Sequence, residues 1–510
     1  MALGEIVNTA SGPVRGTDHA SSRTGERRVR VFRGIPYAEA PIGDRRFRPP
    51  VPRTPWTEPL EATHAGPLAP QNASPLEGML GAGAPPTGED CLSLNIWAPA
   101  ADGANRPVLF WIHGGAFVTG SGATPWYDGE RFARNHDVVV VTINYRLGAL
   151  GFLHLADLFG DDWAGSGNLG ILDQSLALKW TSDNIASFGG DPSNITIFGE
   201  SAGGMSVATQ LGLPASKGLF RRAIAQSGAA GHVHSRETAT DVAKRMLEVL
   251  GVDDPVALQN VPTADLLAAQ EKVNLERTNV AGGGLPFMPC VDGTTLPVGP
   301  QQAVKEGHAS GVDLMLGTNQ DEMTLFTVMD PSLGSLDDAG LARRLGGLFG
   351  EERVTEAIDA YRKDREQATA ADIWNAALSD RVFRVPAVRL ADAQKPNGST
   401  YVYLFTWEST AFDGRLRSCH ALEIPFVWDN LDQAGVTFLT GPVTDDMRAL
   451  ATTMNESWAA FARTGNPSTP TLADWPQWDP ETRPTMVINT DSRVELDPMG
   501  HEIEVWSELL

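Results

Sequence analysis

Residues 195–203 read Ile-Thr-Ile-Phe-Gly-Glu-Ser-Ala-Gly, in which an apolar run leads directly into a G-x-S-x-G pentapeptide centred on Ser201. The apolar run predicts a buried strand, and Val207, Ala208 and Leu211 form a stripe that predicts a helix after it. The small residues of the pentapeptide permit a sharp turn between the two elements, which exposes the serine hydroxyl above a sheet. Because the pattern occurs once in the chain, Ser201 is the candidate nucleophile.

A second glycine turn supplies candidates for binding an oxyanion. Residues 108–112, Val-Leu-Phe-Trp-Ile, predict a buried strand that runs into His-Gly-Gly at 113–115. Two adjacent glycines allow backbone N–H groups to turn toward the negative oxygen that forms when a serine attacks an ester carbonyl. We therefore predict an oxyanion hole made by the N–H groups of Gly114, Gly115 and Ala202.

Further characteristic segments extend along the chain in a fixed order. They include residues 32–38 (FRGIPYA), 89–97 (EDCLSLNIW), 167–174 (GNLGILDQ) and 458–467. With these segments the chain resembles the type B carboxylesterase family of α/β-hydrolases over nearly its whole length, and it is closest in character to the bacterial p-nitrobenzyl esterases. The resemblance implies an α/β-hydrolase fold, with a large, mostly parallel twisted sheet flanked by helices. It also implies a reaction without a metal or an organic cofactor.

The other two members of a catalytic triad come from the resemblance. In α/β-hydrolases the chain order is serine, acid, histidine. The family's histidine segment is similar to residues 420–427, which matches His420, and its acid loop matches Glu322. Glu322 is expected to accept the Nδ1–H of His420 while Nε2 takes the serine proton. From the residues alone, Asp321 and Glu423 stay open as alternative acids.

Four more residues near this set have expected roles. Glu200 precedes the nucleophile and is expected either to tune His420 electrostatically or to shape the pocket floor, and thus to influence the rate without a role in proton transfer. Ser227 resembles a family serine that hydrogen-bonds around the acid. His232 and His234 form a His-x-His pair without a recognisable third ligand, so we interpret them as loop residues rather than as a metal site.

Two arginine–carboxylate pairs match positions at which the family forms buried ion pairs. They are Arg46 with Glu89 and Arg146 with Asp173. A buried charge needs a partner because its desolvation is costly. We therefore expect these four residues to be structural rather than catalytic.

The chain is predicted to form one domain. Of its 510 residues, 42% are hydrophobic, which is ample for a large core, and α/β architectures with insertions keep one continuous sheet at this length. We predict a single catalytic domain over residues 1–510. Insertions at about 237–287 and 332–381 are expected to form helical lids over the carboxyl edge of the sheet.

Two amphipathic helices can be predicted within the second half of the chain. Apolar residues recur at helical spacing over 239–250 and 447–461. The first stripe stops at Gly251 and the second before Gly465, and glycine is a common residue just past a helix C-terminus. Both helices are assigned to packing.

Charge and the N-terminus argue against several partners and compartments. The formal net charge is −23, so the chain lacks the basic excess that binds nucleic acids and anionic membranes. Residues 1–7 lack a basic start followed by an apolar stretch, as a secretory signal would have. We expect a cytoplasmic protein that acts on a small-molecule ester and binds neither nucleic acid nor membrane. Nothing in the sequence indicates an oligomeric state.

The cysteines agree with a reducing compartment. Cys91, Cys290 and Cys419 are too few for a disulfide scaffold. In the family's secreted members the cysteine that matches Cys91 pairs with an upstream cysteine, where this chain has Ala69. Cys419 is either a thiol open to modification or a buried, inert cysteine, and we favour the second interpretation.

These observations predict a serine carboxylesterase that hydrolyses neutral aryl or short- to medium-chain alkyl esters through an acyl-enzyme. One alternative is a specialised hydrolase for a polyester, toxin or drug ester. Another is a non-catalytic, esterase-like binding protein, which the presence of Ser201, Glu322 and His420 disfavours. Residues 71–88 contain no aromatic side chain, so choline esters are expected to be poor substrates for want of a cation–π platform.

Overall fold

One large sheet organises the chain. The structure, a computed structural model, describes residues 2–19, 28–73, 86–99, 102–278, 284–472, 474–507 and 509. Within these residues, thirteen strands form the sheet. Their spatial order is β1 (Ala2–Thr9), β2 (Gly12–His19), β3 (Val29–Pro36), β5 (Ser93–Pro99), β7 (Val139–Ile143), β6 (Arg106–Ile112), β8 (Gly190–Glu200), β9 (Arg222–Gln226), β12 (Asp313–Asn319), β13 (Thr400–Phe405), β14 (Pro484–Ile488) and β15 (Arg493–Leu496), with β4 (Leu60–Glu61) paired to β2.

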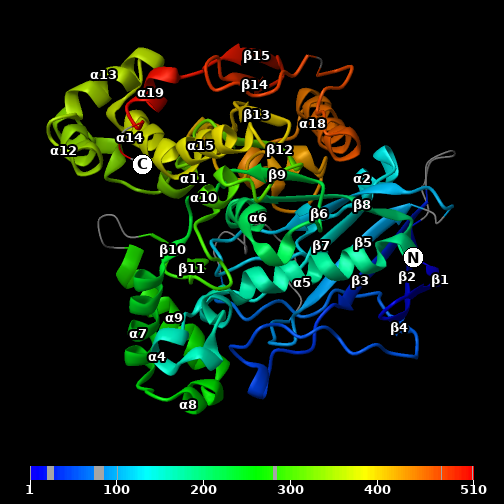
Figure 1. Ribbon diagram of the computed structural model, residues 1–510. Helices are drawn as coiled ribbons and strands as arrows, with labels where there is room; N and C mark the ends of the chain where they lie inside the picture. The colour runs from blue at the N-terminus through cyan, green and yellow to red at the C-terminus, as the bar shows by residue number, and fades with distance from the viewer. Residues whose placement is uncertain are drawn as a thin grey trace.

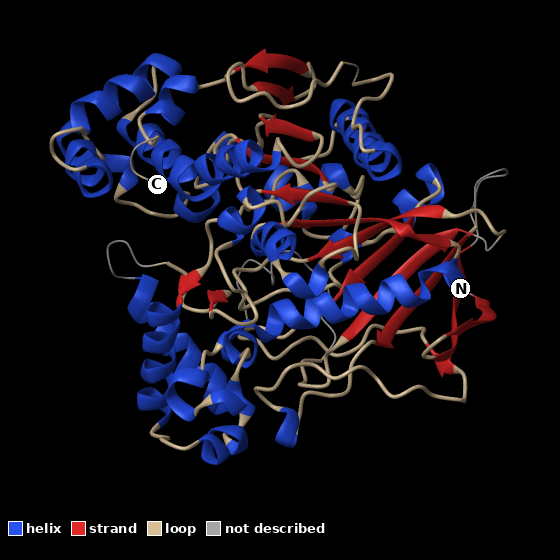
Figure 2. Ribbon diagram, in the orientation of Figure 1, coloured by secondary structure: helices blue, strands red, loops and turns tan. Residues whose placement is uncertain are grey.

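The centre of the sheet is parallel and its edges are antiparallel. Neighbouring strands from β7 through β14 run in the same direction. At one edge, strands β1, β2, β3 and β5 run against one another in that order, and β15 does so against β14 at the other edge, whereas the short β4 is parallel to β2. Figure 2 shows this continuous twisted sheet with helices on both sides. The predicted α/β architecture is therefore confirmed.

Alternating residues of the central strands enter two separate cores. On β6, Val108, Phe110 and Ile112 pack into the core beneath α5 (Leu169–Asn184) and α6 (Ala202–Gly212). Leu109 and Trp111 of the same strand point into the opposite core, beneath α2 (Glu130–His136) and α18 (Asp445–Thr464). Successive side chains of a strand face opposite sides, so an unalternating apolar strand needs helices on both faces.

Strand register brings the two glycine turns together. In the β6–β8 ladder, Ile112 is opposite Gly199. The two strands are parallel and end at the same level, so the segment that follows β6 lies beside the turn that follows β8. The sequence from 113 to 115 and the sequence around Ser201 are thus neighbours, although 86 or more positions separate them along the chain.

Two groups of helices occupy the positions predicted for insertions. The first contains α7 (Arg236–Leu250), α8 (Pro255–Asn260) and α9 (Thr263–Thr278), and the second contains α12 (Asp338–Phe349), α13 (Val354–Asp364) and α14 (Ala370–Ser379). Figure 1 shows the two groups on the left, below and above the level of α6. Residues 279–283 of the first predicted insertion lie outside the described residues.

The two predicted amphipathic helices are confirmed as α7 and α18. Ser235 and Thr444 cap their N-termini by accepting from backbone N–H groups. Gly251 and Gly465 follow their last residues with φ values of 69° and 80°, a left-handed conformation that glycine adopts without steric cost. Sequence and structure agree at these ends because the capping signals are local.

Apart from short 3₁₀ segments, the remaining elements of the described residues are brief. They are α3 (Gly148–Phe152), α4 (Ala156–Phe159), α10 (Pro300–Lys305), α11 (Thr324–Thr327), a π-helical segment η8 (Asp380–Arg384), α15 (Val385–Gln394), α16 (Ile424–Val427), α17 (Val436–Thr440), α19 (Gly500–Glu504) and the two-stranded pair of β10 (His234–Ser235) and β11 (Cys290–Val291). Within the described ranges, no helix combines the length and the apolar character needed to cross a bilayer.

Both expected ion pairs are present, and both arginines are buried. Nη2 of Arg46 lies 2.6 Å from Oε1 of Glu89, and Nη2 of Arg146 lies 2.6 Å from Oδ1 of Asp173. The second pair is the deeper, with side chains 3% and 0% exposed. The Arg146 backbone N–H also donates to Asp173, so this carboxylate fixes the start of the segment that follows β7.

Candidate active site

Ser201 occupies a strained turn between β8 and α6. Its φ and ψ are 58° and −126°, a conformation that is rare for any residue other than glycine and is typically kept at functional sites. The turn depends on close backbone approach. A Cβ atom on Gly203 would lie 2.0 Å from the carbonyl oxygen of Ile112, so a larger residue cannot stand there without shifting α6 away from β6.

The glycine segment after β6 contacts this turn. A Cβ atom on Gly114 would lie 3.0 Å from Cβ of Ser201, and Gly115 has a φ of 106°. Among the described residues, neither glycine's N–H finds a hydrogen-bond acceptor. Ala202 is the first residue of α6, where an N–H has no intrahelical acceptor. Gly114 and Ala202 therefore adjoin Ser201, and Gly115 follows directly in the chain.

His420 and Glu322 form a short, buried pair. Nδ1 of His420 lies 2.6 Å from Oε2 of Glu322, and the two side chains are 6% and 0% exposed. The other carboxylate oxygen of Glu322 accepts the Asn319 N–H at 2.8 Å. Because the Nδ1–H of His420 donates to Glu322, the basic nitrogen of a neutral imidazole is Nε2.

The two alternative acids face other partners. Asp321 accepts from the Arg365 guanidinium at 3.2 Å. Glu423 accepts from the side-chain amides of Asn319 at 2.7 Å and Gln226 at 3.1 Å. Of the three acids that the sequence left open, Glu322 is the one that contacts the imidazole.

Nε2 of His420 lies beside Glu200. It is 3.1 Å from Oε1 of Glu200, within ion-pair distance but without the alignment of a hydrogen bond. In the described part of the chain, no hydrogen bond joins Nε2 to Oγ of Ser201. Glu200 is thus placed to influence His420 through its charge.

Three buried carboxyl groups surround the single imidazole. Burial disfavours the imidazolium, but the charges of Glu200 and Glu322 outweigh it and raise the pKa of His420 to about 9. Burial also raises the pKa of Glu200 well above its usual range. For Glu423, burial and the neighbouring Glu322 raise the pKa together.

Two aromatic side chains that the sequence analysis did not identify also lie beside His420. The Phe326 and Phe383 rings lie 5.3 and 4.8 Å from the imidazole, centroid to centroid. Phe326 is 55% exposed, whereas Phe383 is buried in the π-helical segment η8. Phe326 lies only four positions after Glu322, a proximity that sequence reasoning can use; Phe383 has no such signal.

Ser227 departs from expectation. Its hydroxyl is buried and has no hydrogen-bond partner among the described residues, so the expected bond around the acid is not formed. Both oxygens of Glu322 already have donors, from His420 and Asn319. Ser227 contributes through its backbone instead, because its N–H donates to the Gly317 carbonyl at 2.9 Å.

Each histidine of the His-x-His pair contacts a backbone carbonyl oxygen. His232 Nδ1 lies 3.4 Å from the Ala229 carbonyl oxygen, and His234 Nε2 lies 3.2 Å from that of Pro286. Among the described residues, no group of three or more His, Cys, Asp or Glu side chains has a metal-binding arrangement.

Comparison with known proteins gives one consistent result. The sequence model described as the carboxylesterase family matches residues 4–506. The chain is 40% identical to a para-nitrobenzyl esterase of Bacillus subtilis, over 97% of this chain and 96% of the relative. It is 37% identical to a phenmedipham hydrolase of Pseudarthrobacter oxydans, over 90% and 92% of the two chains. A crystal structure of a Geobacillus stearothermophilus carboxylesterase superposes with a TM-score of 0.85 at 43% identity, covering 98% of this chain and all of the other.

Proposed function

This chain belongs to the carboxylesterase family and is a carboxylic ester hydrolase, and from that premise we propose that Ser201, His420 and Glu322 are its catalytic triad. The observation that carries the proposal is the buried 2.6 Å contact between His420 and Glu322, next to the strained turn at Ser201. A serine on such a turn, a histidine and a buried acid are the parts that acyl transfer needs.

In the proposed reaction, Oγ of Ser201 attacks the ester carbonyl carbon while Nε2 of His420 takes the hydroxyl proton. Glu322 stabilises the imidazolium and holds its orientation. The N–H groups of Gly114, Gly115 and Ala202 bind the negative oxygen of the tetrahedral intermediate. The intermediate collapses when His420 returns the proton to the leaving alcohol, and an acyl-enzyme remains.

Deacylation reverses the roles. Water attacks the acyl carbon while Nε2 of His420 takes its proton, and the second tetrahedral intermediate expels Ser201 Oγ, which regains that proton. The carboxylic acid product leaves. Catalytic hydrogen bonds commonly tighten only when substrate is bound, and in this scheme Nε2 turns from Glu200 toward Ser201 at that stage.

We propose neutral aryl and short- to medium-chain alkyl esters as substrates. The aromatic rings of Phe326 and Phe383 beside His420 favour apolar groups, and one relative is a para-nitrobenzyl esterase. Choline esters should be poor substrates. The aromatic-free stretch that motivates this expectation includes residues 74–85, which lie outside the described residues. Comparing kcat/KM for a p-nitrophenyl ester and a choline ester with the same acyl group tests it, and a preference for the choline ester contradicts it.

Labelling with a fluorophosphonate tests the nucleophile. The probe should modify each native chain once, and peptide mapping should place the label on Ser201. Denaturation beforehand should abolish labelling, because an unfolded serine has no base and no oxyanion hole. Ser201→Ala is the matched control. Retained turnover in that variant, or a label elsewhere, refutes the proposed triad.

The lid role of the two helical insertions is likewise a proposal. The group α7–α9 follows β9 in the chain, and the group α12–α14 follows β12. Ser227 comes directly after β9, and Glu322 comes three residues after β12. A covering element that opens for substrate should exchange backbone hydrogens faster than the central strands and become protected when an inhibitor occupies the site. Exchange equal to that of β6 and β8, with no response to inhibitor, contradicts this role.

We also propose that the enzyme works in the cytoplasm without nucleic-acid or membrane partners. Its three cysteines are unpaired, and a net charge of −23 opposes binding to phosphate-rich surfaces. Cell fractionation tests the compartment, and recovery of the active enzyme in an extracellular or membrane fraction argues against it.

A further inference from the structure

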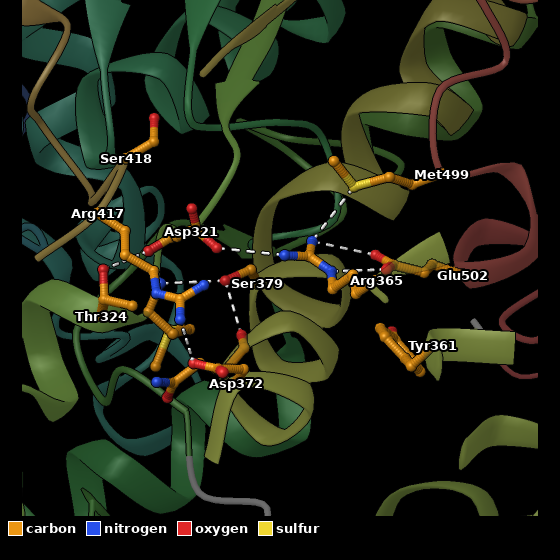
Figure 3. Close-up of polar contacts among 12 residues, drawn as sticks. Asp321, Thr324, Tyr361, Arg365, Asp372, Ser379, Arg417, Ser418, Met499 and Glu502 are labelled. Carbon is orange, nitrogen blue, oxygen red and sulfur yellow. Dashed lines mark hydrogen bonds and ion pairs between the residues drawn. The ribbon is translucent and has the colours of Figure 1, made fainter. Parts of the chain in front are cut away.

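A buried arginine connects the acid loop to the C-terminal helix. Arg365 follows α13, and its side chain is 10% exposed. Nη1 lies 3.2 Å from Oδ1 of Asp321, while Nε lies 2.6 Å from Oε1 of Glu502 on α19. Nη2 adds contacts to the second oxygen of Glu502 at 3.2 Å and to the Met499 sulfur at 3.3 Å. Figure 3 shows the guanidinium between the two carboxylates.

Asp321 depends on this arginine. The carboxylate is 7% exposed, and its second oxygen has no hydrogen-bond partner among the described residues. Burial raises the pKa of Asp321, whereas the charges of Arg365 and then Arg417 lower it. Without Arg365, a buried carboxylate loses its side-chain hydrogen-bond donor, which is costly.

The backbone of Asp321 links the two loops that carry the proposed acid and base. Its N–H donates to the Ser418 carbonyl at 2.9 Å, and its carbonyl accepts from the Thr324 hydroxyl at 2.6 Å. The next residue, Glu322, accepts the His420 N–H at 3.2 Å through its backbone carbonyl. A displacement of Asp321 therefore moves both loops at once.

The other end of the arginine is firmly held. Glu502 is 0% exposed, and its N–H donates to Asp364 at 3.1 Å. Beside it, Tyr361 donates to Asp380 at 2.6 Å and accepts from the Trp506 indole at 2.9 Å. These bonds join α13, η8 and the C-terminal residues into a buried frame, against which Arg365 can fix Asp321.

We propose that Arg365 is a positioning residue for ester hydrolysis: from the C-terminal frame it holds Asp321, and through Asp321 it keeps Glu322 aligned with His420. This inference rests on the proposed triad. Arg365 touches no reacting atom in this scheme. Its effect is geometric, because a displacement of about 1 Å in a catalytic group can reduce the rate about a hundredfold.

The primary test compares Arg365→Gln with Arg362→Gln. Arg362 lies in the last turn of α13, three residues before Arg365, and pairs with Asp338 at 2.8 Å, but both side chains are exposed. We expect Arg365→Gln to lower kcat about tenfold to a hundredfold, the range found when side chains that orient metal-binding residues are replaced, with KM nearly unchanged. Arg362→Gln should match the parent enzyme. Rates are expressed per site titrated by fluorophosphonate, so loss of folded protein does not enter kcat.

Two further variants test the proposal in case Arg365→Gln folds poorly. Arg365→Lys keeps the charge but cannot bond Asp321 and both oxygens of Glu502 together, so it should show a smaller loss of kcat. Glu502→Gln weakens the distant end of the connection and should also lower kcat, although Glu502 lies away from the substrate. Parent-like kcat per titrated site in these variants overturns the proposal.

A double-mutant cycle separates positioning from general destabilisation. If Arg365 acts through Glu322, Arg365→Gln should reduce kcat much less in a Glu322→Gln background than in the parent. An equal reduction in both backgrounds contradicts the proposal. An incorrect assignment of the triad gives a different result, because Ser201→Ala or Glu322→Gln would then retain turnover.

Discussion

Nε2 of His420 lies 3.1 Å from Oε1 of Glu200, the residue immediately before Ser201. The imidazole thus has a carboxyl group at each nitrogen, since Nδ1 contacts Glu322. Both carboxyl groups are nearly inaccessible to water, so their charges are weakly screened. This arrangement stabilises the imidazolium that forms during the reaction, but it also stabilises an imidazolium in the resting enzyme, which cannot act as a base.

The first prediction concerns pH. The pKa of His420 is raised to about 9, so the basic form of the imidazole increases as pH rises through that value, and kcat/KM should rise with it. Glu200→Gln removes a charge that raises this pKa. The rise in kcat/KM should therefore shift to lower pH, and its plateau should fall because the transition-state imidazolium loses a stabilising charge. A pH profile with a p-nitrophenyl ester measures both effects.

A profile that is identical for Glu200→Gln and the parent enzyme would show that Glu200 does not influence the base. Glu423→Gln is a useful comparison. Glu423 is a smaller influence on the pKa of His420 than Glu200, so its substitution should shift the profile less.

The second prediction separates two adjacent carboxylates. Glu322→Gln should lower kcat by about 10⁴, the loss seen when a triad acid is replaced by its amide and the histidine adopts the wrong tautomer. Asp321→Asn should cost far less, because Asp321 contacts Arg365 and not the imidazole. Steady-state kinetics of the two variants measures the difference. The reverse order of effects would make Asp321 the acid.

The third prediction concerns stability. Asp173→Asn should destabilise the fold by about 3–5 kcal/mol, because it leaves the Arg146 guanidinium buried without its counter-charge. Asp183→Asn on the same helix is the control: its pair with Lys179 is about half exposed on both sides, and such pairs contribute little. Urea midpoints measure the two changes. Similar midpoints for both variants would show that the Arg146 pair is not a stabilising element.

The fourth prediction concerns the thiols. Cys91, Cys290 and Cys419 are buried, and burial raises the pKa of each. Because the thiolate is the reactive form, the native enzyme should not react with an aromatic disulfide reagent, and denaturation should release all three thiols. Rapid reaction of one thiol in the folded enzyme, mapped to Cys419, would instead favour its interpretation as a modifiable residue.

Much of the local structure of this protein can be predicted from short stretches of its sequence. The β8–Ser201–α6 turn, the glycine turn after β6 and the ends of α7 and α18 depend on residues a few positions apart, such as Gly203, Gly251 and Gly465. Hydrophobic periodicity, capping and the steric freedom of glycine act over one or two turns of the chain. These features could therefore be recognised without coordinates.

Where the family resemblance is set aside, only the tertiary structure decides which charged groups meet. Glu322 and Asp321 are adjacent in sequence, yet one faces His420, 98 positions away, and the other faces Arg365. The contact of Glu200 with Nε2 and the packing of Phe383 on the imidazole depend likewise on how distant segments meet at the sheet. Such contacts follow from strand order and side-chain direction, which local propensity does not encode, whereas the turn that exposes Ser201 is a property of its own five residues.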